Sequence, residues 1–198
     1  MRSVLDKLVS WIGLALACFL LIAGGLLTWA NGFIGDQVHT QLIMQDITMP
    51  GGDALTGLPS ADASALKKYS GSKLDTGPEA KAFADHYILV HMNEASGNRT
   101  YEDVSGEYIG LSDADKASAD GQALGQLRQT LFMGNTLRGL LLYGYAFATV
   151  GTIAGIAAIA SFAGGAILLV LVALGLWHAR RTAVAADQST TRPVAQPV

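Results

Sequence analysis

Charged residues are scarce in this sequence, because Asp, Glu, Lys and Arg together make up 15% of its 198 residues. An average soluble domain contains about 25% of them. The shortage is concentrated in two apolar runs, residues 9–30 and 140–177, which contain no charged residue. Uninterrupted apolar runs of this length exclude an ordinary soluble globular protein.

Cysteine and the common catalytic motifs are also in short supply. The one cysteine, Cys18, lies within the first apolar run and cannot form an intrachain disulfide. The chain contains no GxSxG, P-loop, GxGxxG or CxxC pattern, so the usual signatures of nucleophilic, phosphate-binding, dinucleotide-binding and redox chemistry are missing. We therefore predict a protein without enzymatic activity and without a cofactor.

The first apolar run is predicted to be a membrane anchor. As a helix, residues 9–30 rise about 33 Å, which is enough to cross a hydrocarbon core of about 30 Å. Trp11 and Trp29 lie near its ends, where aromatic residues meet the membrane interface. A cleaved secretory signal is the alternative, but its apolar core is usually only about 7–15 residues long. The sequence therefore predicts a transmembrane helix over residues 9–31.

The second apolar run is too long for one simple span. The helix from Arg138 to Trp177 would rise roughly 58 Å, and fitting it into a bilayer would need a tilt beyond the usual range of about 0–40°. Splitting it at Gly164-Gly165 leaves a second segment too short to span. The sequence therefore predicts an apolar juxtamembrane helix over 138–152 that continues into a transmembrane helix over 153–178.

Basic residues flank both runs on the side of the chain termini. They are Arg2 and Lys7 before the first run and Arg180 and Arg181 after the second. By the positive-inside rule, both termini are expected in the cytoplasm. Residues 1–8 are then the cytoplasmic N-terminus, and residues 179–198 are predicted to be a disordered cytoplasmic tail.

The segment between the runs, residues 32–137, is acidic, with fourteen Asp and Glu against seven Lys and Arg. Such a surface would repel phosphate backbones, so nucleic acid is not an expected partner. The segment is expected to be an extracytoplasmic domain. The predicted fold class is an all-α, multi-pass protein of the plasma membrane, in which two transmembrane helices frame a small, mostly helical extracytoplasmic domain.

Local signals predict the elements of this domain. A short helix is expected over 60–69, and a longer one over 76–96, whose first turn holds a proline and a glutamate and whose end is marked by Gly97. The stretch 98–108 is rich in turn residues and is predicted to be a turn region with a possible hairpin. Ser112 is expected to begin a helix that continues into the second span.

One cluster resembles a metal site. His86, His91 and Glu94 offer the two histidines and one carboxylate of a non-haem iron centre. On a regular helix the two histidines would point about 140° apart, so they could not share a metal without help. We therefore expect these side chains to form hydrogen bonds and predict no metal site, while a metal enzyme stays as a third hypothesis.

The second run also carries the predicted interface. Apolar side chains outside the bilayer must be covered, either by the protein's own external domain or by a neighbouring membrane protein. Small residues at four-residue spacing let helices approach closely in lipid, which suits self-association, intramolecular packing or docking on a foreign helix. The predicted helix-packing or partner interface comprises Leu140, Leu141, Tyr143, Tyr145, Phe147, Gly151, Gly155 and Ala158.

Residues 82–101 and the frame of two terminal spans resemble a group of small actinobacterial membrane proteins, often labelled aromatic ring-opening dioxygenase. The shared pattern includes a short segment like Asp46-Ile47-Thr48, a helix that ends in Glu-Ala-Ser-Gly-x-x-Thr-Tyr, here residues 94–101, and a second span introduced by Leu137-Arg138. The dioxygenase label does not suit this chain, because an extradiol iron site needs histidines and a carboxylate that converge on one point, and this chain does not supply such a converging set.

The chain is also similar to mycobacterial respiratory supercomplex association factors. These are small subunits with two spans and an external domain, which lie between the cytochrome bcc and cytochrome aa3 oxidase complexes. The resemblance implies a non-enzymatic accessory subunit in the lipid bilayer that docks on these integral membrane proteins and bridges them. The alternative is an independent membrane-anchored envelope protein whose extracytoplasmic domain binds a ligand.

Overall fold

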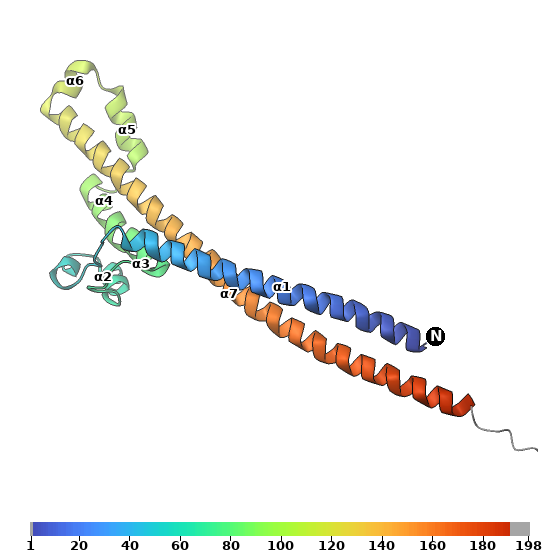
Figure 1. Ribbon diagram of the computed structural model, residues 1–198. Helices are drawn as coiled ribbons and strands as arrows, with labels where there is room; N and C mark the ends of the chain where they lie inside the picture. Colours follow the sequence, from blue (N-terminus) through green and yellow to red (C-terminus); the bar gives the residue numbers. More distant parts are fainter. Residues whose placement is uncertain (1, 191–198) are drawn as a thin grey trace, which may run out of the picture. The chain divides into compact units, whose positions relative to one another are not determined.

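The computed structural model describes residues 2–190, and the side chains of residue 5 and residues 7–181, and it is all-helical over this part of the chain (Figure 1). Two long helices, α1 (Arg2–Ile43) and α7 (Ala119–Thr190), stand at the ends of the element order. The short elements between them are η1 (Gly52–Leu55), α2 (Ser60–Lys67), α3 (Gly77–Phe83), η2 (Ala84–Ile88), α4 (Leu89–Ser96), α5 (Tyr101–Gly110) and α6 (Asp113–Ala117). The prediction of an all-α fold is confirmed.

The chain forms two compact units, and α1 and α7 contribute to both. Among the described residues, the hairpin unit consists of residues 2–32 and 152–190, and the central unit consists of residues 33–151. Both long helices are long and apolar enough to cross a membrane, over Lys7–Ile43 and Ala119–Arg181. Only 17% of the residues in the most apolar window of each helix are buried, whereas the core helix of a soluble protein is mostly buried.

In the hairpin unit, α1 and α7 run antiparallel and touch through small residues (Figure 1). A Cβ atom added to Gly13 would lie 3.0 Å from Val172, and one added to Gly24 would lie 3.0 Å from the Phe162 ring. Ala17 is fully buried between these contacts. The missing side chains let the helices approach closely, and in lipid this dispersion contact replaces the hydrophobic driving force.

Helix α7 extends further toward the C-terminus than the sequence suggested. It is helical as far as Thr190, so the expectation that disorder begins at residue 179 is wrong for residues 179–190. The sequence there is rich in alanine, the strongest helix former, and this favours continuation of the helix. The rest of the predicted tail, residues 191–198, lies outside the described residues.

The central unit has two small cores, and α7 contributes to both. Leu141 of α7 packs in the first core with Leu42 of α1, Leu66 of α2, and Met49 and Leu74 from the connecting segments. In the second core, Leu131 of α7 packs with Met92 of α4 and Val104 of α5. The short elements therefore depend on α7 for the apolar surface that they bury.

Helix caps explain most of the short elements. Thr76 and Glu79 form a capping box at the start of α3, and Gly97 ends α4 with a positive φ of 63°. The predicted helix over 76–96 is thus confirmed, although the π-helical turn η2 interrupts its regular hydrogen bonding. Ser112 caps α6 as predicted, but that helix ends at Ala117 and α7 begins separately at Ala119.

The prediction of a turn region with a possible hairpin over 98–108 is wrong. Residues 101–110 form helix α5, because Thr100 and Asp103 build a second capping box at its start. The Thr100 side chain accepts a hydrogen bond from the Asp103 backbone N–H, and the Asp103 carboxylate accepts one from the Thr100 N–H. The turn signals of Gly97 and Asn98 belong to the end of α4 instead.

Two glycines offer a matched test of the packing between α3 and α7. A Cβ atom on Gly77 would collide with the Ala148 side chain and lie 3.2 Å from the Tyr145 Cα, whereas one on Gly106 in α5 would meet open space. We expect Gly77→Ala to destabilise the central unit by about 1–3 kcal/mol. We expect Gly106→Ala to stabilise α5 by about 0.5–1 kcal/mol, because alanine is the better helix former.

Hydrogen exchange followed by mass spectrometry on the full chain in nanodiscs would measure both effects. Protection of α3 should fall in Gly77→Ala, and protection of α5 should rise in Gly106→Ala. Unchanged exchange of α3 in Gly77→Ala would contradict the close contact between Gly77 and α7.

Candidate functional site

One face of α7 in the central unit is covered by the protein itself. Leu141 is 2% exposed and lies in the first core. Next to it, Leu42 of α1 lies 3.4 Å from the position that a Cβ atom of Gly144 would occupy. The start of α3 at Gly77 packs against the backbone of α7 at Tyr145. The protein's own domain therefore supplies cover for Leu141 and partial cover for Tyr145.

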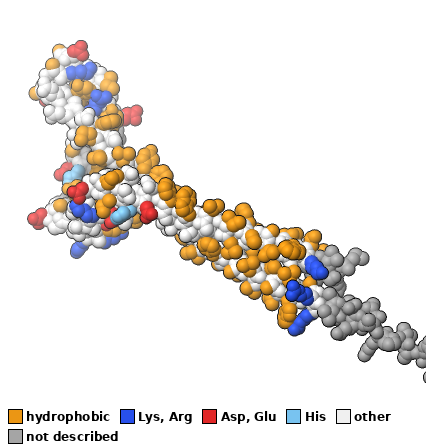
Figure 2. Space-filling view, viewed as in Figure 1, with side chains coloured by type: hydrophobic (Ala, Val, Ile, Leu, Met, Phe, Trp, Pro, Cys, Tyr) orange, Lys and Arg blue, Asp and Glu red, His pale blue; other side chains and the backbone are white. Residues whose placement is uncertain are grey.

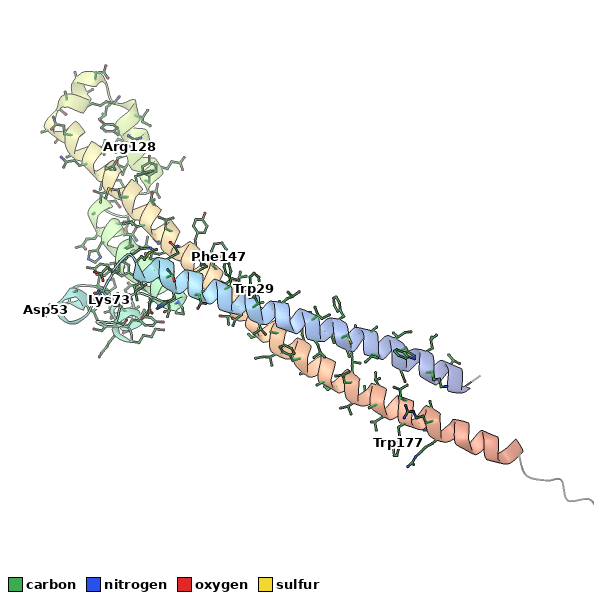
Figure 3. The ribbon with its side chains drawn as sticks, in the orientation of Figure 1. Trp29, Asp53, Lys73, Arg128, Phe147 and Trp177 are labelled. Atoms are coloured by element: carbon green, nitrogen blue, oxygen red, sulfur yellow. The ribbon has the colours of Figure 1, made fainter. Side chains whose placement is uncertain are left out.

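The opposite face of α7 has no such cover. The exposed α7 face consists of Met133, Leu137, Leu140, Tyr143, Phe147 and Val150, whose side chains are between 48% and 67% exposed. Figure 3 labels Phe147 on this helix. In Figure 2, the Asp and Glu side chains gather over the short helices, Lys and Arg side chains lie both there and at the terminal end of the long helices, and hydrophobic side chains cover the length between. The sequence left two covers open, the protein's own domain or a neighbouring protein. The structure shows the protein's own domain covering one face of α7 and leaves the side chains of the other face exposed.

A groove runs beside this face, between α1 and α7 of the central unit. Its volume is about 610 Å³. The lining residues are Phe33, Ile34, Gln37, Val38, Gln41 and Leu42 of α1, Gln45 in the turn after α1, and Leu140, Gly144, Phe147 and Val150 of α7. This α1–α7 groove contains no charged side chain, although it belongs to an acidic unit. Its polar groups are three glutamine amides on the α1 side.

The small-residue part of the predicted interface packs within the chain. Ala158 is 3% exposed, and a Cβ atom on Gly155 would lie 3.1 Å from the Asn31 side chain of α1. Gly151 is also buried. Among the alternatives of self-association, intramolecular packing and foreign docking, the structure uses Gly155 and Ala158 for intramolecular packing.

An ion-pair cluster holds α7 against the helices that cover it. The Arg138 guanidinium lies 2.8 Å from Asp85 of η2, and Lys81 of α3 pairs with the same carboxylate. Burial alone would raise the pKa of Asp85, but the hydrogen bonds and positive charges of Lys81 and Arg138 hold it below its usual value. Because Arg138 lies on α7 between Leu137 and Leu141, this cluster fixes which face of the helix is turned inward.

A second carboxylate, that of Glu79, holds the loop before α3 against the start of that helix. Its side chain accepts hydrogen bonds from the hydroxyls of Thr76 at 2.7 Å and Ser72 at 2.8 Å. Burial alone would raise its pKa, but these bonds and those from the backbone N–H groups of Asp75 and Thr76 outweigh burial and lower the pKa. The carboxylate therefore ties the preceding loop to the helix that packs on α7.

The structure does not bring the predicted metal cluster together. The Nδ1 atom of His86 lies 2.7 Å from the Asp62 carboxylate of α2. The Nδ1 atom of His91 lies 2.8 Å from the backbone carbonyl of Tyr87. Among the residues that the structure describes, no group of three or more His, Cys, Asp and Glu side chains is placed to hold a metal ion.

Sequence reasoning missed the groove and the Asp85–Arg138 pair. Gln37 and Gln41 lie four residues apart, a spacing that places them on one side of α1, and this signal was available; Gln45 follows at the same interval in the turn after the helix. The contact between Asp85 and Arg138 joins residues far apart in the chain and leaves no local pattern. Comparison with protein-family models, curated proteins and solved structures finds no match for this chain.

The pKa of Glu79 predicts how stability depends on pH. Because its folded pKa is lowered, its contribution is fully present above the ordinary carboxyl pKa of about 4.3 and is lost as the pH falls through the folded value. The folded pKa of Asp85 is lowered as well, so its contribution to stability is also lost as the pH falls. We expect the protection of α3 from hydrogen exchange, corrected for the intrinsic rate, to fall on acidification below that range.

Glu79→Gln should reduce this protection already at pH 7 and weaken its further loss in acid, because the amide cannot gain the charge that the four donors stabilise. Glu94→Gln is the matched control, since Glu94 lies on the same segment with an exposed side chain. An identical acid response in Glu79→Gln and the unaltered protein would show that Glu79 is not the responsible group.

Proposed function

We propose that this protein is a non-enzymatic accessory subunit that is anchored in the membrane and docks on larger integral membrane proteins. The observation that supports this most directly is the exposed α7 face, an apolar stripe on a helix whose other side is packed. Soluble surfaces rarely carry contiguous large apolar side chains unless these bind something. A docking surface needs no catalytic group, and the sequence contains none of the common catalytic motifs named above.

The proposed topology places the hairpin unit in the bilayer and the central unit outside the cytoplasm. Lys7, Arg180 and Arg181 lie at the terminal ends of the two candidate spans, which puts both termini on the cytoplasmic side by the positive-inside rule. The acidic balance of residues 32–137 suits the opposite side. In this arrangement the exposed α7 face lies next to the span and partly in water.

Burial of this face would supply the driving force for docking. Fully burying one large apolar side chain contributes about 1.5–3 kcal/mol. The face offers six such side chains, each about half exposed or more, and their burial would offset part of the cost of association and of ordering them. Helix α7 is already ordered by Arg138 and the two cores, so little further entropy is lost on binding.

The proposed partners are the cytochrome bcc and cytochrome aa3 oxidase complexes of an actinobacterial plasma membrane. Support for this comes from the resemblance of residues 82–101 and of the two-span frame to supercomplex association factors. A subunit that bridges two membrane complexes needs two contact surfaces. The exposed α7 face is one candidate, and the lipid-facing sides of the hairpin unit are the other.

Polar substitution on the exposed face tests this function. In Leu140→Gln combined with Tyr143→Gln, we expect the amount of haem-containing partner that is retained in mild detergent to fall at least tenfold. Both side chains are exposed, so the fold should survive. The measurement is the visible haem absorbance of the affinity-purified protein per mole of tagged chain.

Thr149→Gln is the matched control, because Thr149 is an exposed residue of the same helix that lies outside the stripe and the groove. It should retain the partner fully. Purification of the unaltered protein alone and monodisperse, without a haem protein at near-equal amount, would refute the proposed function.

A further inference from the structure

We propose that the hairpin unit binds one anionic phospholipid, with an acyl chain in a second groove between α1 and α7 and the headgroup at the basic end of the two helices. We call this second groove the terminal groove, because it lies near the start of α1 and the end of α7. Only the assignment of this lipid to the cytoplasmic leaflet rests on the proposed function, through the topology given there.

The terminal groove is lined mainly by hydrocarbon and has a volume of about 410 Å³. Its aliphatic side chains are those of Val9 on α1 and of Leu168, Leu171 and Val172 on α7, and its polar ones are those of Ser10 and His178. Val9 and Leu171 are 64% and 56% exposed and form its walls, whereas Val172 and Ser10 are buried at its floor. Such a lining suits an acyl chain, which gains dispersion contacts with both helices.

The terminal groove extends through one half of a bilayer. Between Leu168 and His178, α7 rises about 15 Å, which is half of a hydrocarbon core of about 30 Å. Further along, the helices close on one another, because Ala17 is fully buried and a Cβ atom on Gly165 would lie 3.0 Å from Leu21. A transmembrane helix of another protein would find no groove beyond this point, whereas an acyl chain of one leaflet ends there.

Positive charge surrounds the terminal end of the hairpin unit. Lys7, Arg180 and Arg181 are exposed there, and no carboxylate occurs among the hairpin-unit side chains that the structure describes. In Figure 2, Lys and Arg side chains lie at this end of the long helices. In the sequence, Arg2 and Asp6 add one charge of each sign. The phosphate of an anionic lipid complements this excess of positive charge.

Arg181 is the residue best placed to bind the headgroup. It lies three residues after His178, so it continues the side of α7 on which the terminal groove ends. Its guanidinium stacks 3.8 Å from the centre of the Trp177 ring, and Trp177 is labelled on α7 in Figure 3. Exposed tryptophans of membrane spans lie at the level of the headgroups. Stacking on a ring face uses none of the N–H groups of Arg181, so these can donate to a phosphate.

Native mass spectrometry of the full chain in detergent tests this inference. Phosphatidylglycerol and phosphatidylcholine with identical acyl chains are added at equal concentrations. We expect one phosphatidylglycerol to bind at least about fivefold more tightly than phosphatidylcholine, because one basic residue near the surface gives a gain of about this size.

Substitution of the two arginines separates a built site from diffuse attraction. Arg181→Gln should weaken phosphatidylglycerol binding about fivefold. Arg180→Gln is the matched control, because Arg180 is turned about 200° around α7 from His178 and so lies away from the terminal groove. It should weaken binding much less, although it removes the same charge at nearly the same depth.

A bulky side chain in the terminal groove tests where the acyl chain lies. Leu171→Trp should weaken phosphatidylglycerol binding several-fold, because the indole would occupy the space of the acyl chain. Val170→Trp is the control, since Val170 is 59% exposed on the same helix but does not line the terminal groove. Both original side chains are exposed, so both variants should fold.

Four results would overturn the inference. They are equal affinity for the two lipids, equal losses in Arg181→Gln and Arg180→Gln, unaltered binding in Leu171→Trp, and a dimer of this chain that carries no lipid. The proposed function is scored separately, by the haem protein that is retained with the affinity-purified chain. Absence of that partner refutes the function and leaves lipid binding by the hairpin unit standing.

Discussion

The length of the uncharged stretch of α7 is the constraint on which the rest of the structure depends. The stretch from Gly139 to Trp177 is longer than a bilayer core of about 30 Å can surround, so part of this helix needs protein cover. The central unit provides cover on one side through Leu141, Leu42 and the start of α3. The caps and cores of the short helices serve mainly to hold this cover in place.

Electrostatics decides which side of α7 is covered. A helix with apolar residues all round has no preferred inward face, but Arg138 introduces one, because its guanidinium pairs with Asp85. Breaking a largely buried pair leaves an uncompensated charge and is costly, so a rotated helix is strongly disfavoured. Leu140 and Phe147 then stay outside as a consequence of where Arg138 points.

Local sequence signals predicted where the helices begin and end better than they predicted the contacts between the helices. The capping residues Thr76 and Glu79 and the terminal Gly97 were sufficient to place the helix over 76–96, because such signals act within one turn. Thr100 and Asp103 give an equally local signal, which the neighbouring turn residues obscured. The groove and the Asp85–Arg138 pair depend on tertiary contacts between distant residues, and no pattern within a single helix specifies them.

Side-chain size determines where α7 packs closely against α1 and where the two helices leave a groove between them. Where small residues line the helix, as at Gly155 and Ala158, α1 approaches closely and no room is left for a partner. Where large residues alternate with Gly144, the two helices leave a groove that the chain does not fill. An apolar groove that the chain does not fill forfeits dispersion contacts along its walls, so the docking proposed above would add contacts there that the chain itself does not make.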